Sequence, residues 1–143
     1  MEDFTKMRTW AQVDLNALAH NYHALRALTP DGCKFLGLVK ANAYGHGAVP
    51  VAKKLETLGC DMLAVACLAE AAQLRNAGIT LPILCLGYTP AEHTDLLLKY
   101  RVTQTVGDLE TGRALSQAAQ RAGGVLDIHV KLDTGMGRIG FLW

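Results

Sequence analysis

One short stretch of the chain, FLGLVKANAYGHG (residues 35–47), concentrates residues that could do chemistry. Lys40 ends an apolar run, and partial burial there would favour the neutral form of its amine. A neutral lysine amine is a nucleophile toward aldehydes. Tyr44 adds a hydroxyl donor, and Gly45 and Gly47 let a backbone approach a ligand closely. Alternatively, Lys40 simply reaches from a strand end into water and has no chemical role.

A second stretch, KLDTGMGRIG (residues 131–140), carries Arg138 within a run of glycines. Gly135, Gly137 and Gly140 spell G-x-G-x-x-G after an expected strand, as in dinucleotide-binding proteins. That fingerprint requires a following helix and an acidic residue about 20 positions further on, and the chain has no room for either. We therefore reject an NAD-type site. Taken alone, Arg138 would be a surface arginine after a glycine turn.

These residues must be positioned by regular elements, and the chain alternates apolar strands with amphipathic helices. A first strand is expected over residues 9–15, with Asp14 placed to cap a helix over 16–28. The further strands are expected over residues 34–40, 62–67, 82–87, 102–106 and 126–132. The helices between them are expected over residues 48–59, 68–78, 92–99 and 108–123.

This alternation predicts an α/β fold with a parallel sheet covered by helices. Two architectures remain open, a doubly wound sheet and part of a (β/α)8 barrel. A whole barrel takes about 250 residues, so this chain would supply roughly the first five of its eight strands, preceded by one extra strand and helix. In both architectures active sites gather where strands end, which is where Lys40 lies.

The composition excludes several classes of protein. The chain has 143 residues and a net charge of +1, without the basic stripe of a nucleic-acid binder. No apolar run approaches the length of a membrane span, and residues 1–8 do not resemble a signal peptide, so we expect a soluble, cytoplasmic protein. The four cysteines lack metal-ligand spacing, which favours reduced thiols and no metal site.

Two of these sequence motifs together identify a family. VKANAYGHG resembles the pyridoxal-phosphate attachment motif of alanine racemases, and DTGMGR resembles their second signature. The resemblance implies a pyridoxal 5'-phosphate-binding (β/α)8 barrel followed by a β domain. It implies that Lys40 carries the cofactor and acts as one catalytic base, and that Tyr44 hydrogen-bonds its phosphate. It places Arg138 near the cofactor's phenolic oxygen and the substrate carboxylate, and it makes Lys131 a candidate for the carbamylated lysine that holds the arginine in many members.

The resemblance implies interconversion of L- and D-alanine, which supplies D-alanine for bacterial peptidoglycan, by a homodimer. The second base, a tyrosine of the partner's β domain in this family, has no match in this chain. We therefore expect residues 1–143 to be a truncated part of the barrel, inactive alone and self-associating through exposed sheet edges. The alternatives are an inactive structural fragment, a pyridoxal-phosphate-binding barrel without racemase activity, and a serine-preferring racemase domain.

Overall fold

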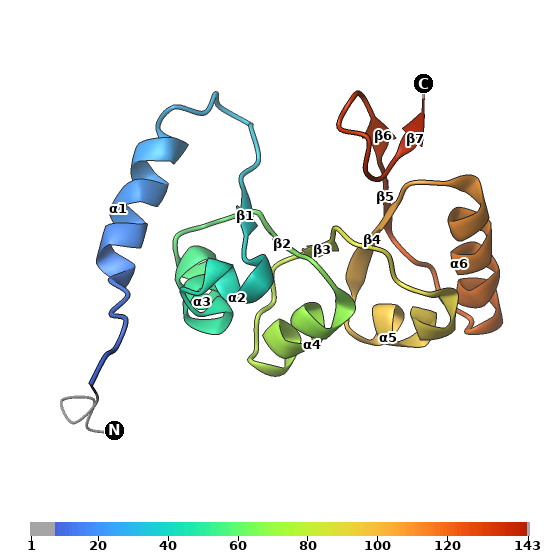
Figure 1. Cartoon of the computed structure of the whole chain (residues 1–143), viewed down its shortest axis with the longest axis horizontal. Coiled ribbons are helices and arrows are strands. Elements are labelled where there is room, and N and C mark those ends of the chain that lie inside the picture. The colour runs from blue at the N-terminus through green and yellow to red at the C-terminus, as the bar shows by residue number, and fades with distance from the viewer. Residues whose placement is uncertain (1–7, 143) are drawn as a thin grey trace.

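The five central strands form one parallel sheet whose spatial order follows the chain (Figure 1). The computed structural model describes residues 8–142 of the protein. The strands are β1 (Leu36–Leu38), β2 (Met62–Val65), β3 (Ile83–Cys85), β4 (Val102–Val106) and β5 (Ile128–Val130). A separate parallel pair follows, made of β6 (Leu132–Asp133) and β7 (Phe141–Leu142).

Helices connect each strand of the five-stranded sheet to the next, and one further helix precedes β1. In Figure 1 the helices flank the row of strands from below and at its two ends. They are α1 (Leu15–Arg26), α2 (Lys40–Tyr44), α3 (Ala48–Thr57), α4 (Leu68–Asn76), the 3₁₀ turn η2 (Ala91–His93), α5 (Thr94–Lys99) and α6 (Leu109–Arg121). Asp14 caps α1 as predicted, because its carboxylate accepts from the amides of Asn16 and Ala17.

The strand order decides between the two architectures. A doubly wound sheet reverses its strand order at a switch point and carries helices on both faces. Here the order is β1-β2-β3-β4-β5 without a reversal, which is the winding of a (β/α)8 barrel. The prediction of about five barrel strands is confirmed, and the boundaries of the five differ from the predicted ones by no more than two residues.

The core lies between the sheet and the helices. Its largest fully buried apolar side chains are Leu63, Leu74, Ile83, Leu97 and Leu115. Strand β1 comes so close to α3 that a Cβ on Gly37 would lie 2.7 Å from the Leu55 side chain. Burial of such side chains is the main favourable contribution to folding.

The other face of the sheet is open to solvent at its outer strands, whereas Ala64 and Leu84 on the middle strands are buried. The last edge of the sheet is open as well. Leu36 and Leu38, which alternate with the buried Gly37, are 41% and 40% exposed. On β5, Ile128 and Val130 are exposed although both are apolar. In a closed barrel each outer strand would have a neighbour on both sides, so the described residues present a partly uncovered inner face and, at β5, an edge without a neighbouring strand.

The predicted strand over residues 9–15 is wrong. Residues 8–14 are in no strand, and α1 already begins at Leu15. Alternating side chains are only one requirement of a strand, since a strand also needs a neighbour that accepts its backbone hydrogen bonds. Within residues 8–142 this segment pairs with no strand, and its apolar Trp10 and Val13 are 57% and 38% exposed.

The cysteines are all free thiols, with Cys60 and Cys85 buried and Cys33 and Cys67 exposed. None of the helices in residues 8–142 has the length and hydropathy needed to cross a bilayer. The expectation about a signal peptide rests on residues 1–8, which lie almost entirely outside the described part of the chain.

At the amino-terminal side of the sheet, one arginine on α4 donates hydrogen bonds to the backbone carbonyls of a turn and of a helix end. The Nη1 atom of Arg75 donates to the carbonyls of Ile79 and Leu81, at 2.8 and 2.7 Å. Its Nε and Nη2 atoms donate to Tyr100 and Arg101, at 2.8 and 3.2 Å. Burial, and then the nearby Arg101 charge, lowers the pKa of Arg75, and Glu56 partly offsets this. The bonds therefore bind α4 to the end of α5.

We predict that Arg75→Lys lowers the free energy of unfolding by about 1–3 kcal/mol, since a lysine cannot reproduce a planar fork of donors. Denaturant-induced unfolding would measure the loss. Arg113→Lys, on the exposed face of α6, is the matched control and should change stability by less than about 0.5 kcal/mol. Equal losses in the two variants would contradict the role of Arg75.

Candidate active site

The backbone becomes left-handed immediately after Lys40. The four residues from Ala41 to Tyr44 have φ angles of 50–54°, and the amide of Ala43 donates to the carbonyl of Val39 at 2.9 Å. Residues with a Cβ rarely adopt this conformation in succession, because each costs roughly 1–2 kcal/mol relative to the right-handed form. Backbone strain of this kind is concentrated at functional sites.

Side chains of the motif itself hold this turn. The carboxamide oxygen of Asn42 accepts from the amide of Ala48 at 2.8 Å and so satisfies a donor at the start of α3. His46 Nδ1 lies 2.9 Å from the carbonyl oxygen of Ala43. Gly47 has a φ of +91°, which favours glycine there. The turn and the start of α3 are thus one hydrogen-bonded unit.

Lys40 and Tyr44 are brought together by the left-handed turn. The Lys40 amine lies 6.0 Å from the centre of the Tyr44 ring, at the outer limit for a cation–π contact. Lys40 is partly buried, whereas Tyr44 is 59% exposed. An amine and a phenol therefore project from one rigid turn at the carboxyl end of β1, the end at which active sites of this architecture form.

The second motif is organised by the carboxylate of Asp133. Its Oδ1 accepts from the amides of Gly135 and Gly137, both at 3.0 Å, and its Oδ2 accepts from the amide of Arg138 at 3.1 Å. The bonds from Gly137 and Gly135, followed by that from Arg138, hold the pKa of Asp133 below its ordinary value of 3.8. The side chain of Asp133 thus fixes the backbone from which Arg138 projects.

The three glycines of the second motif serve this loop and not a dinucleotide. Gly135 and Gly137 have positive φ angles, of 129° and 69°. A Cβ on Gly140 would lie 2.6 Å from the amide nitrogen of Asp133, so only glycine allows this close approach. The motif is followed by strand β7 and not by a helix, which agrees with the rejection of an NAD-type site.

Arg138 is exposed and lines a cavity of about 310 Å³ beyond the ends of β3 and β4, with Tyr88 and Asp108 among its other walls. Neither Lys40 nor Tyr44 lines this cavity. The residues of the two motifs therefore lie at the same ends of parallel strands, but within the described residues they do not meet in one cavity.

Lys131 lies between β5 and β6 and is partly buried. Its amide donates to the carbonyl of Val106, and its carbonyl accepts from the amide of Phe141, both at 2.9 Å. Since His129 pairs with Thr105 on the inner face of the sheet, the alternation of side chains puts Lys131 on that face too. The lysine therefore belongs to the inner face, beside the exposed last strand of the sheet.

Comparison with known proteins shows the family of the chain. The family model described as "Alanine racemase, N-terminal domain" matches residues 13–143. The chain belongs to this family.

Individual relatives agree with the family match. An alanine racemase of Desulfovibrio desulfuricans is 48% identical over 131 residues, which is 92% of this chain and 35% of that protein. Alanine racemase 1 of Clostridium acetobutylicum is 47% identical over 133 residues, or 93% of this chain and 34% of that protein.

Solved structures of racemases share the fold. An alanine racemase of Clostridium difficile 630 superimposes with a TM-score of 0.92 at 47% identity, covering 96% of this chain and 36% of that one. A histidine racemase of Leuconostoc mesenteroides gives a TM-score of 0.82 at 30% identity, covering 90% of this chain and 34% of that one. The chain thus spans about a third of the length of the relatives that it matches.

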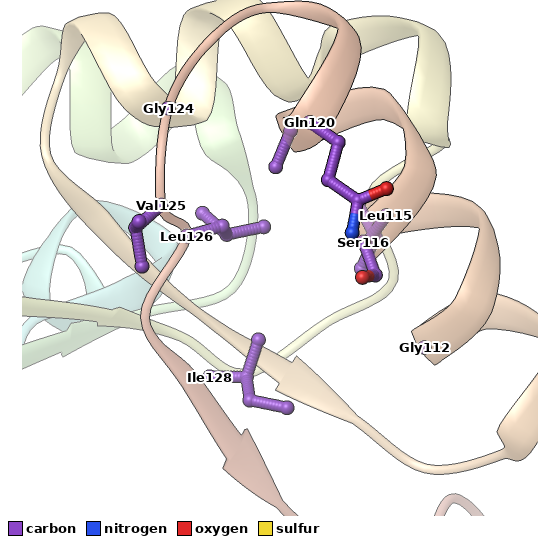
Figure 2. Close-up of a pocket in the computed structure, with 9 residues that line it drawn as sticks. Gly112, Leu115, Ser116, Gln120, Gly124, Val125, Leu126 and Ile128 are labelled. Atoms are coloured by element: carbon purple, nitrogen blue, oxygen red, sulfur yellow. The ribbon is translucent and has the colours of Figure 1, made fainter.

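Another cavity of this racemase-family domain lies away from both motifs. Figure 2 shows it between α6 and β5, with a volume of about 300 Å³. Its lining side chains are mostly apolar, among them Leu115, Val125 and Ile128, and they include no titratable group. A catalytic site needs groups that exchange protons or form bonds, so this cavity is a gap beside the open edge of the sheet and not a candidate site.

Two residues that organise the motifs were not singled out from the sequence. Asp133 was visible within Asp-Thr-Gly, a pattern in which an aspartate commonly accepts from the amides that follow it. Glu70, on α4, accepts from the amide of Ala41 in the Lys40 turn. No sequence signal connects Glu70 to a residue 29 positions earlier.

The Asp133 bonds should make the order of the Arg138 loop depend on pH. Because folding lowers the pKa of Asp133, its stabilising effect is complete above the unfolded value and is lost as the pH falls through the folded value, below 3.8. We predict that the amide resonances of Gly135 and Gly137 titrate in this acid range. In Asp133→Asn this titration should be absent, and a midpoint at or above 3.8 in the wild type would contradict the assignment.

Proposed function

We propose that this chain is the cofactor-binding part of a pyridoxal-phosphate-dependent racemase that interconverts L- and D-alanine and so supplies D-alanine for peptidoglycan. The observation that carries the proposal is the Lys40 turn. It presents an amine and a phenol at the carboxyl end of β1, in a chain that is 48% identical to an alanine racemase over 131 residues.

Pyridoxal phosphate would fit the chemistry of this turn. Its aldehyde requires a primary amine, and Lys40 is partly buried at the end of a strand. Its phosphate requires donors, and Tyr44, which is exposed and carries a hydroxyl, lies on the same turn. The cofactor, when bound, supplies an electron sink for a substrate that loses its α proton. Lys40 would bind the cofactor and exchange the proton on one side of the substrate carbon.

Arg138 and Lys131, both in the second motif (residues 131–140), would add further groups to the proposed site. The guanidinium of Arg138 suits a phenolic oxygen and a carboxylate, because its donors lie in a fixed plane and it stays charged. The amides that bind Asp133 hold the backbone of Arg138 in place for this role. Carbamylation of Lys131 would replace its positive charge with a negative one and remove a repulsion from the arginine.

The rest of the site would come from residues outside this chain. Racemisation needs proton-exchanging groups on both sides of one carbon, and Lys40 can serve only one of them. We propose that a tyrosine of a partner subunit supplies the other in the complete enzyme, a homodimer. This chain alone would then bind the cofactor without catalysing turnover.

The choice of substrate has a second candidate. The solved histidine racemase shares the fold of this chain at 30% identity, so this barrel half occurs in racemases that are named for different amino acids. The alternative to alanine is serine, because the motif resemblance also admits a serine-preferring racemase domain. Comparing the rates with the two amino acids in a complete enzyme that contains this chain would separate them.

We predict that pyridoxal phosphate labels Lys40 specifically. The purified chain would be mixed with the cofactor, reduced with borohydride and digested, and the modified peptide found by mass. Lys40→Ala should abolish the adduct, while Lys53→Ala, at an exposed lysine of α3, should leave it unchanged. Scattered labelling of surface lysines, or none, would favour a structural fragment without a cofactor site.

We also predict that the chain self-associates through the open edge of its sheet. Val130 on β5 is 61% exposed and has no strand beyond it in the described residues. Sedimentation velocity should show dimers or larger species, and Val130→Lys should shift them toward monomers. Val125→Lys, at a side chain that is 90% exposed but outside the strand, is the matched control. A monomeric wild type would contradict this prediction.

A further inference from the structure

The carboxylate of Glu70 joins the Lys40 turn to the neighbouring strand. Its Oε1 accepts from the amide of Ala41 and its Oε2 from the amide of Ala66, both at 2.7 Å. Ala41 directly follows Lys40, and Ala66 directly follows β2. One side chain therefore uses both of its oxygens to hold the ends of two adjacent strands.

This bridge begins where the sheet itself stops. The amide of Val39 donates to the carbonyl of Ala64 at 2.9 Å, and this is the last backbone bond between the ends of β1 and β2 in the described residues. Beyond it the chain turns left-handed, and the first amides of such a turn have no acceptor within the turn. Glu70 supplies that acceptor for Ala41 with a charged oxygen, which makes the bond stronger than one between neutral groups.

A purely local role explains only half of this arrangement. Cys67 is the N-cap of α4, so Glu70 is the third residue of the helix, from which a glutamate commonly reaches back to satisfy an amide near the cap. The bond to Ala66 has this local character. The bond to Ala41 does not, since it crosses from α4 to a different βα loop.

We propose that Glu70 is a positioning residue for Lys40: by fixing the amide that follows the lysine, it sets the direction in which the amine leaves the strand. The inference rests on the proposed function, in which Lys40 carries the cofactor. It requires a carboxylate, because two backbone donors must be accepted at once and a glutamine offers one acceptor oxygen in the same volume.

Glu56 provides a matched control at the opposite end of the sheet. It lies on α3, and its Oε1 accepts from the amide and hydroxyl of Thr80 and from the amide of Leu81, just before β3. These bonds lower the pKa of Glu56, those from Thr80 most. Glu56 is thus a second carboxylate that binds a loop through backbone amides, but it makes no bond to the Lys40 turn.

The test compares Glu70→Gln and Glu70→Ala with Glu56→Ala in the complete chain. Without cofactor, amide hydrogen exchange at Ala41 should accelerate roughly 10- to 100-fold in Glu70→Ala, the loss expected for a bond to a charged acceptor, and should stay unchanged in Glu56→Ala. With pyridoxal phosphate, both Glu70 variants should bind about tenfold more weakly or worse, while Glu56→Ala binds within about twofold of the wild type despite its lower stability.

The outcomes separate this inference from the proposed function. If the wild type forms no adduct at Lys40, the proposed function fails, and the exchange rate of Ala41 alone decides whether Glu70 holds the turn. If exchange at Ala41 is the same in Glu70→Ala and the wild type, the positioning role is overturned. It is equally overturned if Glu56→Ala weakens cofactor binding as much as Glu70→Ala, because the effect would then be one of general stability.

Discussion

The left-handed turn after Lys40 is the constraint on which the arrangement of this domain depends. Four successive residues in this conformation cost roughly 4–8 kcal/mol, comparable with the whole stability of a typical domain. Such a turn persists only where its surroundings determine it, and here three neighbouring elements do so. Asn42 binds it to the start of α3, Glu70 binds it to α4, and the bond from Val39 to Ala64 fixes the strand that enters it. The amine therefore leaves the sheet from a rigid support.

Much of this fold could be predicted from the sequence, because the pattern of apolar residues indicates which segments are buried. Strands covered by helices read as apolar runs, and these runs placed all five strands of the sheet. The same reasoning failed over residues 9–15, where alternation suggested a strand that the structure does not form. Alternation describes which side chains share a face, but a strand exists only if another backbone pairs with it. That condition depends on the fold as a whole and on chain outside this segment.

The candidate site was predictable as a set of residues but not as a geometry. Lys40, Tyr44 and Arg138 stood out through their motifs, and the local bonds of Asp133 could have been inferred from the residues that follow it. The turn itself was not predictable, since Ala41 and Ala43 are residues that normally avoid positive φ. The hydrogen bond from the amide of Ala41 to Glu70 was equally unpredictable, because the two residues are 29 positions apart and no sequence pattern connects them. Local propensity fails here because tertiary contacts override it.

The bonds that support the Lys40 turn and the cavity that Arg138 lines lie in different parts of the domain. The bonds described for the Lys40 turn come from β1, β2, α3 and α4, so the support of the Lys40 amine lies within the first two βα units. Arg138 lies apart from these supports, since it lines a separate cavity beyond the ends of β3 and β4. A histidine racemase and alanine racemases share this barrel half with TM-scores of 0.82 and 0.92. The fold of this half therefore does not by itself distinguish racemases that are named for different amino acids.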